Sequence, residues 1–387
     1  MYFYCETDIR PLDYRVGEKM RFTLTLREGG ATVFPDAVVR YRIEADGKAG
    51  YREGEASAES PLTLYAGCDM PGFVRITAKL YTKSGEPCGE CGEFNGGAGA
   101  GIDRIFPATP LPSDYAGYRE TILQKIKSVK PELIEKVELP SEKAGFRLFD
   151  VKISCAGNAP VSGYLTVPDG CGKLRCKVGY KGYGVKYPLP EYEDGTAYLF
   201  TNAHGFENGR EQSYYDELSL GKLANYGMSV EENARPETSY FYDMIVRAVT
   251  AAEFMTTLDV WNGKDLILYG GSQGGMQALN AASLCEKCTF CDVFVPWMCD
   301  TAAKAKGRMR YASPEYARGL AYFDGTNAAR YIKCETRIDA GLGDYVCQPS
   351  GVIAMYNELK CRKTITFTQN MIHGSKEPDG ISESLVG

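Results

Sequence analysis

One serine of the chain lies in a segment whose glycines suggest a chemical role. Ser272 stands at the centre of Gly270-Gly271-Ser272-Gln273-Gly274, which fits the pattern G-x-S-x-G of a sharp turn between a strand and a helix. Side chains at Gly270 and Gly274 would collide with these two elements, and the strained backbone lifts the serine hydroxyl clear of the sheet. The helix then points its free amide groups at the place where an oxyanion would form. We therefore predict a nucleophilic serine, with an unreactive serine in a glycine-rich turn as the alternative.

A serine hydroxyl needs a base before it can attack a carbonyl carbon. The chain contains two histidines, His204 and His373. Behind a turn of this kind the order along the chain is serine, then acid, then histidine, so His373 is the base. The acid should follow a strand between the two, where Asp344 fits best and Asp339, inside the predicted strand, is the lesser candidate. Ser272, Asp344 and His373 are thus the predicted triad of a serine hydrolase.

The elements that must hold these residues surround them in the sequence. Residues 265–269 form an apolar run that predicts a buried strand before the serine, and residues 273–284 predict the helix after it. Further strands are expected at 146–154, 160–167, 176–180, 197–201, 290–295, 336–340 and 364–368, with helices at 115–128 and 239–257. Such alternation indicates a mostly parallel sheet covered on both faces. Together with the turn at Ser272, it predicts an α/β-hydrolase fold for residues 106–387.

Residues 1–105 have a different pattern. Segments 15–26, 38–43 and 73–81 alternate polar and apolar residues, and no helical period appears. Short, half-buried strands at this spacing predict a small all-β, immunoglobulin-like sandwich. Residues 90–101, with five glycines, and the segment 107–112, which begins and ends with proline, are interpreted as the junction. We expect this accessory domain to be a spacer or packing module, because no sequence feature supports carbohydrate binding.

The overall composition narrows the class of protein and of partner. Of the 387 residues, 44% are hydrophobic and 24% are charged, and the net charge is −6. Without a basic patch the chain is not expected to bind nucleic acid or anionic membranes, and no apolar run approaches the ~20 residues of a membrane span. The first residues lack the basic start and apolar core of a signal peptide. We expect a cytoplasmic location, with a periplasmic or secreted protein whose signal has been removed as the alternative.

The chain has fourteen cysteines, so metal binding and disulfides must be weighed. Cys285, Cys288 and Cys291 are spaced like metal ligands, and so are Cys88 and Cys91. A closed zinc site, however, needs four ligands, and neither histidine is near these cysteines in sequence. Free, mostly buried thiols in a reducing compartment are the preferred interpretation. We predict no metal and no organic cofactor.

Several stretches, taken together, resemble one family of enzymes. The sequence from about Ser113 to the end resembles the acetyl xylan esterase and cephalosporin C deacetylase family, carbohydrate esterase family seven of the α/β-hydrolases. The matching stretches are Gly270-Gly271-Ser272-Gln273-Gly274-Gly275, Gly341-Leu342-Gly343-Asp344-Tyr345-Val346-Cys347-Gln348-Pro349-Ser350, Val295-Pro296-Trp297-Met298-Cys299-Asp300, Gly163-Tyr164-Leu165-Thr166-Val167-Pro168 and Tyr180-Lys181-Gly182-Tyr183. The first two stretches together make the resemblance specific.

The resemblance implies roles for particular residues and a class of substrate. Ser272 would be the nucleophile, Asp344 the acid and His373 the base, and the backbone amides of Gln273 and Tyr183 would form the oxyanion hole. That hole agrees with the rule of one donor after the nucleophile and one from an early loop. The substrates would be acetyl esters of carbohydrates, such as acetylated xylan or xylo-oligosaccharides, hydrolysed through an acyl-enzyme. The resemblance also suggests a homo-oligomer, such as a hexamer, unless the front domain blocks that packing.

Two departures from the family bear on the substrate pocket. Asn202-Ala203-His204-Gly205 stands where the family usually carries Arg-Gly-Gln-Gly, and Gly374 follows the histidine where glutamate is common. His204 could line the mouth of the pocket, although a structural histidine is the preferred interpretation. Trp297 could border a small acyl pocket, although an aromatic residue after a buried strand usually belongs to the core.

Two other functions are compatible with parts of the sequence. A serine peptidase of the prolyl oligopeptidase type also places a β domain before a G-x-S-x-G-G hydrolase, but its propeller is larger than about a hundred residues. A non-catalytic binding or scaffold protein on the hydrolase fold would explain the altered stretch at His204. The complete set of Ser272, Asp344 and His373 in the expected order argues against that role.

Overall fold

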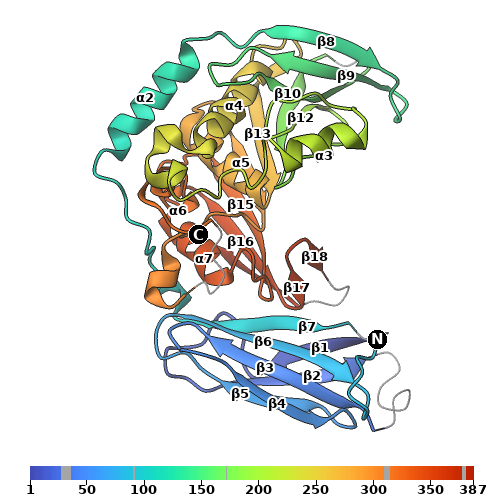
Figure 1. Ribbon diagram of the computed structural model, residues 1–387, viewed down its shortest axis with the longest axis vertical. Helices are drawn as coiled ribbons and strands as arrows, with labels where there is room; N and C mark the ends of the chain where they lie inside the picture. The colour runs from blue at the N-terminus through green and yellow to red at the C-terminus, as the bar shows by residue number, and fades with distance from the viewer. Residues whose placement is uncertain (28–35, 90–91, 171, 309–313, 377–380) are drawn as a thin grey trace.

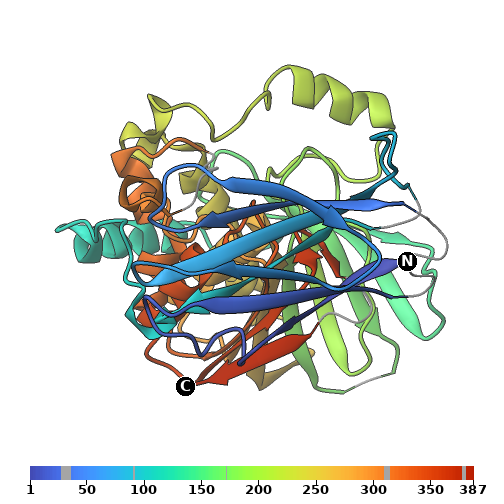
Figure 2. The same ribbon diagram turned by 90° about the horizontal axis from the view of Figure 1, so that it is seen from below.

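The computed structural model describes residues 1–27, 36–89, 92–170, 172–308, 314–376 and 381–387 (Figure 1). Its first seven strands, between residues 2 and 100, form a region that we call the sandwich. The described elements from residue 115 onward form a larger region around a ten-stranded sheet, which we call the α/β region. Figure 2 shows the sandwich in front of the α/β region, so the sandwich covers one end of it.

The sandwich consists of two antiparallel sheets. One has the order β1-β2-β5 and the other the order β4-β3-β6-β7. Their bounds are Tyr2–Thr7 for β1, Met20–Arg27 for β2, Val38–Ala45 for β3, Arg52–Ser57 for β4, Leu62–Ala66 for β5, Gly72–Tyr81 for β6 and Phe94–Ala100 for β7. Alternate residues point inward, as with Val74, Ile76 and Leu80 of β6, and they meet Phe22 of the other sheet in one apolar core. Seven strands divided three and four confirm the predicted immunoglobulin-like sandwich.

The glycine-rich segment before residue 101 is a strand, and its interpretation as part of a junction was wrong. β7 is buried throughout and pairs with β6 in register. A Cβ atom at Gly97 would overlap the carbonyl oxygen of Val74, and one at Gly99 would press against the ring of Phe73. These glycines therefore permit close packing inside a sheet, whereas glycines in a linker supply flexibility. The boundary expected between residues 105 and 106 stays a prediction.

The ten-stranded sheet has the order β19-β16-β15-β14-β13-β11-β12-β10-β9-β8. Its six central strands, from β16 to β12, are parallel, and the flanking strands are antiparallel. The bounds are Leu133–Leu139 for β8, Phe146–Ile153 for β9, Val161–Pro168 for β10, Leu174–Tyr180 for β11, Thr196–Thr201 for β12, Trp261–Gly271 for β13, Phe290–Phe294 for β14, Glu335–Gly341 for β15, Lys363–Thr368 for β16 and Ser382–Val386 for β19. This mostly parallel sheet confirms the predicted α/β-hydrolase fold.

Helices pack on this sheet between its strands. They are α2 (Tyr115–Lys127), α3 (Gln212–Leu220), α4 (Tyr240–Met255), α5 (Gln273–Leu284), α6 (Gly325–Ala329) and α7 (Pro349–Glu358). α4 and α5 lie against each other and against β11 and β13, and α7 lies against β15. Nearly every residue of α4 is buried, which fits its position in the interior of the α/β region. None of the described helices combines the length and apolar character that crossing a bilayer requires.

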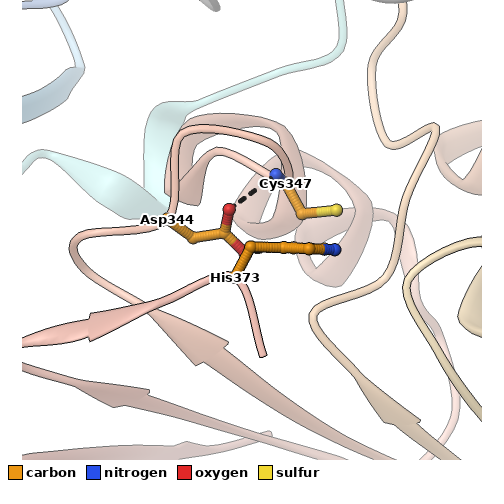
Figure 3. A group of neighbouring side chains, drawn as sticks. All are labelled: Asp344, Cys347 and His373. Atoms are coloured by element: carbon orange, nitrogen blue, oxygen red, sulfur yellow. Dashed lines mark hydrogen bonds and ion pairs between the residues drawn. The ribbon is translucent and has the colours of Figure 1, made fainter. Parts of the chain in front are cut away.

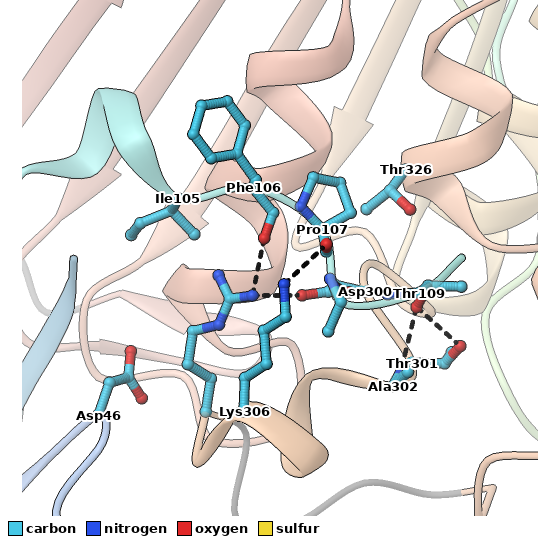
Figure 4. A network of polar contacts seen from close by, with 12 residues as sticks. Asp46, Ile105, Phe106, Pro107, Thr109, Asp300, Thr301, Ala302, Lys306 and Thr326 are labelled. Atoms are coloured by element: carbon cyan, nitrogen blue, oxygen red, sulfur yellow. Dashed lines mark hydrogen bonds and ion pairs between the residues drawn. The ribbon is translucent and has the colours of Figure 1, made fainter. Parts of the chain in front are cut away.

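The segment that leaves the sandwich is fixed to the α/β region by buried polar groups (Figure 4). The carboxylate of Asp300 accepts hydrogen bonds from the backbone amides of Ala108 and Thr109, at 2.6 and 2.8 Å. Arg308 lies 3.3 Å from the same carboxylate and donates to the carbonyl oxygen of Phe106. Burial, reinforced by the charge of Asp324, raises the pKa of Asp300. These contacts tie the segment that leaves the sandwich to the α/β region.

Candidate active site

Ser272 occupies a strained turn between β13 and α5. Its backbone has φ 54° and ψ −122°, a conformation that residues with a side chain rarely adopt. Glycine is required at positions 270 and 274, because other backbone atoms lie too close to leave room for a side chain. A Cβ atom at Gly270 would overlap the backbone of Gly274, and one at Gly274 would overlap the carbonyl oxygen of Tyr180. The turn therefore has the geometry of a nucleophile elbow, with the serine at its apex.

Ser272, His373 and Asp344 lie in one chain of contacts. Nε2 of His373 is 3.0 Å from Oγ of Ser272, and Nδ1 of His373 is 3.0 Å from Oδ2 of Asp344. An ionised carboxylate only accepts hydrogen bonds, so Nδ1 carries the proton and Nε2 can accept the serine proton. The structure thus brings together the three residues that the sequence predicted. The lesser candidate for the acid, Asp339, lies inside β15.

The acid and the base each follow a strand of the α/β region, and they differ in how far they are buried. Asp344 follows β15, its side chain is 0% exposed, and its second oxygen accepts from the backbone amides of Val346 and Cys347, at 2.8 and 2.9 Å (Figure 3). His373 follows the short strand β17 (Met371–Ile372), and its ring is 27% exposed. The carboxylate is therefore fixed in the interior, whereas the imidazole can reach both the serine and a bound substrate.

Cys347 is a member of this site for which the sequence predicted no role. Its thiol and the facing atoms of Asp344 and His373 all lie within 4.8 Å of one another (Figure 3). Burial raises the pKa of the Cys347 thiol well above its ordinary value, and the charge of Asp344 adds to this, while a hydrogen bond with Ser272 acts in the opposite direction. The thiol is therefore neutral at ordinary pH and does not compete with the serine as a nucleophile.

The cysteines with metal-ligand spacing in the sequence, which we interpreted as free thiols, are described in part. Cys285, Cys288 and Cys291 are buried free thiols, and the sulfur of Cys288 lies 3.5 Å from that of Cys334. Among the described residues, the group around Asp344 is the one cluster with metal-ligand spacing. Its atoms are accounted for by the hydrogen bonds above. Cys91, the predicted partner of Cys88, lies outside the described residues.

Gln273 and the loop that contains Tyr183 lie beside the serine and are tied together. Gln273 is the first residue of α5, and Tyr183 follows β11. The hydroxyl of Tyr226 donates to the side chain of Gln273 at 3.1 Å and accepts from the backbone amide of Gly184 at 2.9 Å. The ring of Tyr183, which is 50% exposed, stacks on that of Tyr226. Sequence patterns did not point to Tyr226, because it lies far from both segments along the chain.

His204 lies in the interior behind this loop. Its ring is 7% exposed, with Nδ1 2.7 Å from the hydroxyl of Tyr240 and Nε2 3.3 Å from the carbonyl oxygen of Gly184. Burial lowers the pKa of His204 to about 4, and the charge of Arg247 contributes in the same direction, so the ring is neutral. This position fits the structural histidine that the sequence favoured. It also gives the altered stretch a physical task, since His204 supports the loop of Tyr183.

A buried arginine holds the stretch around His204 in place. Arg247 of α4 donates to the carbonyl oxygen of Ala203 at 2.9 Å and to the side chain of Asn158 at 2.8 Å. Inside the stretch, the side chain of Asn202 accepts from the amides of His204 and Gly205. Arg247 was part of a predicted helix, but nothing in the sequence linked it to residue 203. The stretch is therefore firmly built although its residues differ from those usual in the family.

Trp297 lies next to the serine through its backbone. Its amide donates to the carbonyl oxygen of Ser272 at 3.0 Å, and its half-buried ring meets the edge of Phe241. Around it, Val295, Met298 and Asp300 have positive φ angles although none is glycine. A residue with this conformation normally costs about 1–3 kcal/mol, and such residues cluster at functional sites.

Comparisons with known proteins place the chain among esterases. The family model for acetyl xylan esterases matches residues 102–378, more than two thirds of the chain. An acetyl esterase of Xylanibacter ruminicola is 25% identical over 298 residues, which cover 73% of this chain and 68% of that protein. An acetyl xylan esterase from Paenibacillus sp. R4 superimposes with a TM-score of 0.61 at 21% identity, over 71% of this chain and 94% of that one. Acetyl xylan esterase 1 from Thermoanaerobacterium sp. JW/SL YS485 has a TM-score of 0.59 at 19% identity, over 72% and 93% of the two chains.

Proposed function

Because the chain belongs to the acetyl xylan esterase family and is a carboxylic-ester hydrolase, we propose a substrate class for it. The proposed reaction removes acetyl groups from acetylated carbohydrates, such as xylo-oligosaccharides. Ser272, His373 and Asp344 would be its catalytic residues. The observation that carries the proposal is the unbroken contact from the serine hydroxyl through the imidazole to the buried carboxylate. The names of the relatives support acetate as the acyl group and a sugar as the alcohol.

The reaction begins with attack by Ser272 on the carbonyl carbon of the ester. As the bond between Oγ and carbon forms, Nε2 of His373 takes the hydroxyl proton, and Asp344 stabilises the imidazolium. His373 then gives its proton to the sugar oxygen while the ester bond breaks, and the acetyl-serine remains. Water attacks the acetyl-serine by the same route in the second half of the reaction. The products are acetate, the free sugar hydroxyl and a proton.

The negative charge of the tetrahedral intermediate needs donors on the side away from the histidine. We assign this task to the backbone amides of Gln273 and Tyr183, because α5 begins at Gln273 and the loop of Tyr183 is bonded to it through Tyr226. A donor of this kind has been worth about 3–4 kcal/mol where one was removed. His204 would act on the hole indirectly, by holding Gly184.

A preference for acetate over longer acyl groups would come from the wall beside the serine. Trp297 is the candidate for that wall, since its backbone is bonded to Ser272 and its ring is fixed by Phe241. Such a wall would leave room for a methyl group and exclude a propyl chain. One methylene is typically worth about 1–3 kcal/mol in a fitted apolar pocket.

The proposal is tested by acetate release from acetylated xylo-oligosaccharides, simple acetylated sugars and cephalosporin C. We expect release from at least one carbohydrate ester, about 10-fold or greater preference for 4-nitrophenyl acetate over the butyrate, and no cleavage of aminoacyl-proline amides. Ser272→Ala is the matched control. Equal rates on long acyl esters would refute the small acyl pocket. If no ester is turned over and Ser272→Ala equals the parent, the chain is a scaffold and the proposal falls.

A further inference from the structure

The loops that carry the acid and the base both rest on one strand of the sandwich. The loop with Asp344 begins at the carboxyl end of β15, the segment that leads to His373 begins at the carboxyl end of β16, and both ends face the sandwich. Figure 1 shows the hairpin of β17 and β18 (Ser375–Lys376) directly above β7. The contacts between β7 and these loops are made by buried groups, and they are specific in geometry.

The side chain of Gln369 makes the pair of hydrogen bonds to β7 that the backbone of a neighbouring strand would make. Its side-chain oxygen accepts from the amide of Gly97 at 3.0 Å, and its side-chain nitrogen donates to the carbonyl oxygen of Gly97 at 2.5 Å. The side chain is 2% exposed, and its own backbone amide is bonded to Ile381. A Cβ atom at Gly96 would overlap the side-chain oxygen of Gln369. Glycine in β7 is therefore what lets this amide reach the strand.

Asn370 continues the same contact toward the histidine. Its side-chain oxygen accepts from the backbone amide of Asn95 at 3.0 Å, and it is 8% exposed. Its φ of 50° turns the chain from β16 into β17, three residues before His373. Asparagine tolerates this left-handed conformation better than most residues. The contact with β7 thus fixes the turn that aims the histidine.

The acid loop is held by the same strand and by the base loop. A Cβ atom at Gly343 would overlap the carbonyl oxygen of Asn95, so the residue before Asp344 lies against β7 without a gap. The amide of Gly343 also donates to the carbonyl oxygen of Met371 at 3.1 Å, which joins the two loops. Asp344 also lines a cavity of about 40 Å³ together with Phe73 and Arg75 of the sandwich.

A second strand of the sandwich contacts the residue that follows the acid. Arg75 of β6 donates to the side chain of Asn95 at 3.2 Å and places its guanidinium 4.7 Å from the ring centre of Tyr345. Tyr345 directly follows Asp344 in sequence. The loop with the acid therefore contacts β6, β7 and the loop with the base.

We propose that the sandwich is a positioning element of the active site, in which β7 sets the distance between Asp344 and His373 through Gln369 and Asn370. This assigns the first hundred residues a task beyond that of a spacer or packing module. Neither Gln369 nor Asn370 touches the reacting atoms; they act through the histidine. The inference rests on the proposed function for its kinetic consequence, but the geometry that it describes can be measured without any substrate.

The kinetic test compares variants that lose hydrogen bonds to β7 with a variant that loses a different contact between the sandwich and the α/β region. Gln369→Leu keeps the approximate volume and removes both hydrogen bonds to Gly97. We expect kcat on 4-nitrophenyl acetate to fall about 30-fold with KM within about two-fold, because small misplacement of a catalytic group is costly while the substrate still binds. Asn370→Gly should act alike, and Asn370→Asp, which keeps the acceptor for Asn95, should restore kcat to within about three-fold of the parent.

Arg10→Gln is the matched control. It removes the exposed ion pair of Arg10 with Glu383, a contact between the same regions that does not touch β7 or the catalytic loops. We expect the kcat of this variant to equal that of the parent. If Arg10→Gln lost as much kcat as Gln369→Leu, or if Gln369→Leu were fully active, the positioning role would be refuted. Should Gln369→Leu fail to fold, Asn370→Gly and Asn370→Asp provide the same comparison.

A spectroscopic test separates this inference from the proposed function. The chain has two histidines, so ¹⁵N-histidine labelling gives NMR signals that His204→Gln assigns. We expect the Nδ1 proton of His373, bound to Asp344, to give a strongly downfield signal in the parent and in Arg10→Gln, and to be lost or broadened in Gln369→Leu. An unchanged signal in Gln369→Leu would overturn the inference, whether or not the protein hydrolyses esters. An inactive parent with the expected signals would instead overturn the proposed function.

Discussion

The sandwich and the serine edge of the α/β region differ in how much backbone strain they contain. Among the described residues of the sandwich, Asp36 is the one non-glycine residue with a positive φ. The described part of the α/β region has six, of which Ser272, Val295, Met298 and Asp300 lie within thirty residues and Asn370 lies just before the base. The sandwich is built from regular alternation, whereas the serine edge is built from conformations that cost energy and must be held by their neighbours.

This difference shows where packing is used for stability and where it is used for geometry. In β6 the buried residues follow the two-residue period of a strand, so many of them could be exchanged for others of similar size. At the elbow, Gly274 faces the backbone of Tyr180 and leaves no room for any side chain. Three changes test how far this contrast holds.

The largest effect is expected at the apex of the elbow. Ser272→Gly should lower ester hydrolysis at least about 10⁴-fold, since the nucleophile is lost. The same change should raise the free energy of unfolding by about 1 kcal/mol, because glycine adopts the conformation at φ 54° without strain. Urea denaturation and a 4-nitrophenyl acetate assay measure the two. A stability no higher than that of the parent would show that the turn is not strained.

The next change adds one methyl group, and it should affect stability more than Ser272→Gly does. Gly274→Ala should lower the free energy of unfolding by about 3 kcal/mol and abolish activity, because the methyl group meets backbone that cannot move aside. Gly89→Ala, in an open turn of the sandwich with nothing near its Cβ, should change stability by less than about 0.5 kcal/mol. Chemical denaturation compares them. Similar losses for both variants would break the contrast between the two regions.

The third effect concerns pH, and its histidine contribution belongs to the α/β region alone because both histidines lie there. The pKa of His204 is lowered to about 4 by burial, so between pH 6.5 and 4 the unfolded chain binds a proton that the folded chain does not. Stability must therefore fall as the pH falls through this window. From pH 7 to pH 5 the loss from this group is on the order of 2 kcal/mol.

His204→Gln isolates this contribution from that of the carboxylates. The variant should lose less stability than the parent between pH 7 and pH 5, as measured by denaturation at both values. Its stability at pH 7 is expected to be lower, because the hydrogen bonds to Tyr240 and Gly184 change. A variant whose stability changed with pH as steeply as that of the parent would show that His204 is not held neutral.

Much of the fold and the centre of the site could be predicted from the sequence, because local patterns determine them. The alternation of β6, the apolar run before Ser272 and the helix after it each lie within a dozen residues. The order of serine, acid and base then selected Asp344 and His373, and the structure brings these side chains together. Such features depend on periodicity and on the geometry of one turn.

What the sequence did not show depends on contacts between distant segments. The glycines of β7 have the composition of a linker, and their use became visible only with Gln369 beside them. Tyr226, Arg247 and Cys347 support the site through hydrogen bonds to distant segments or through burial, which leave no periodic signal. Polar contacts of this kind follow from the tertiary arrangement, so residue type and spacing alone do not reveal them.

The bond between Gly97 and Gln369 joins positions 272 residues apart in the chain. Domains generally fold in order as they leave the ribosome, so we expect the sandwich to be complete long before residue 369 is synthesised. The loops that carry Asp344 and His373 would then pack against a sandwich that is already folded. Contacts of such long range also slow folding, and catalytic competence should therefore emerge as the last step in the maturation of the newly made protein.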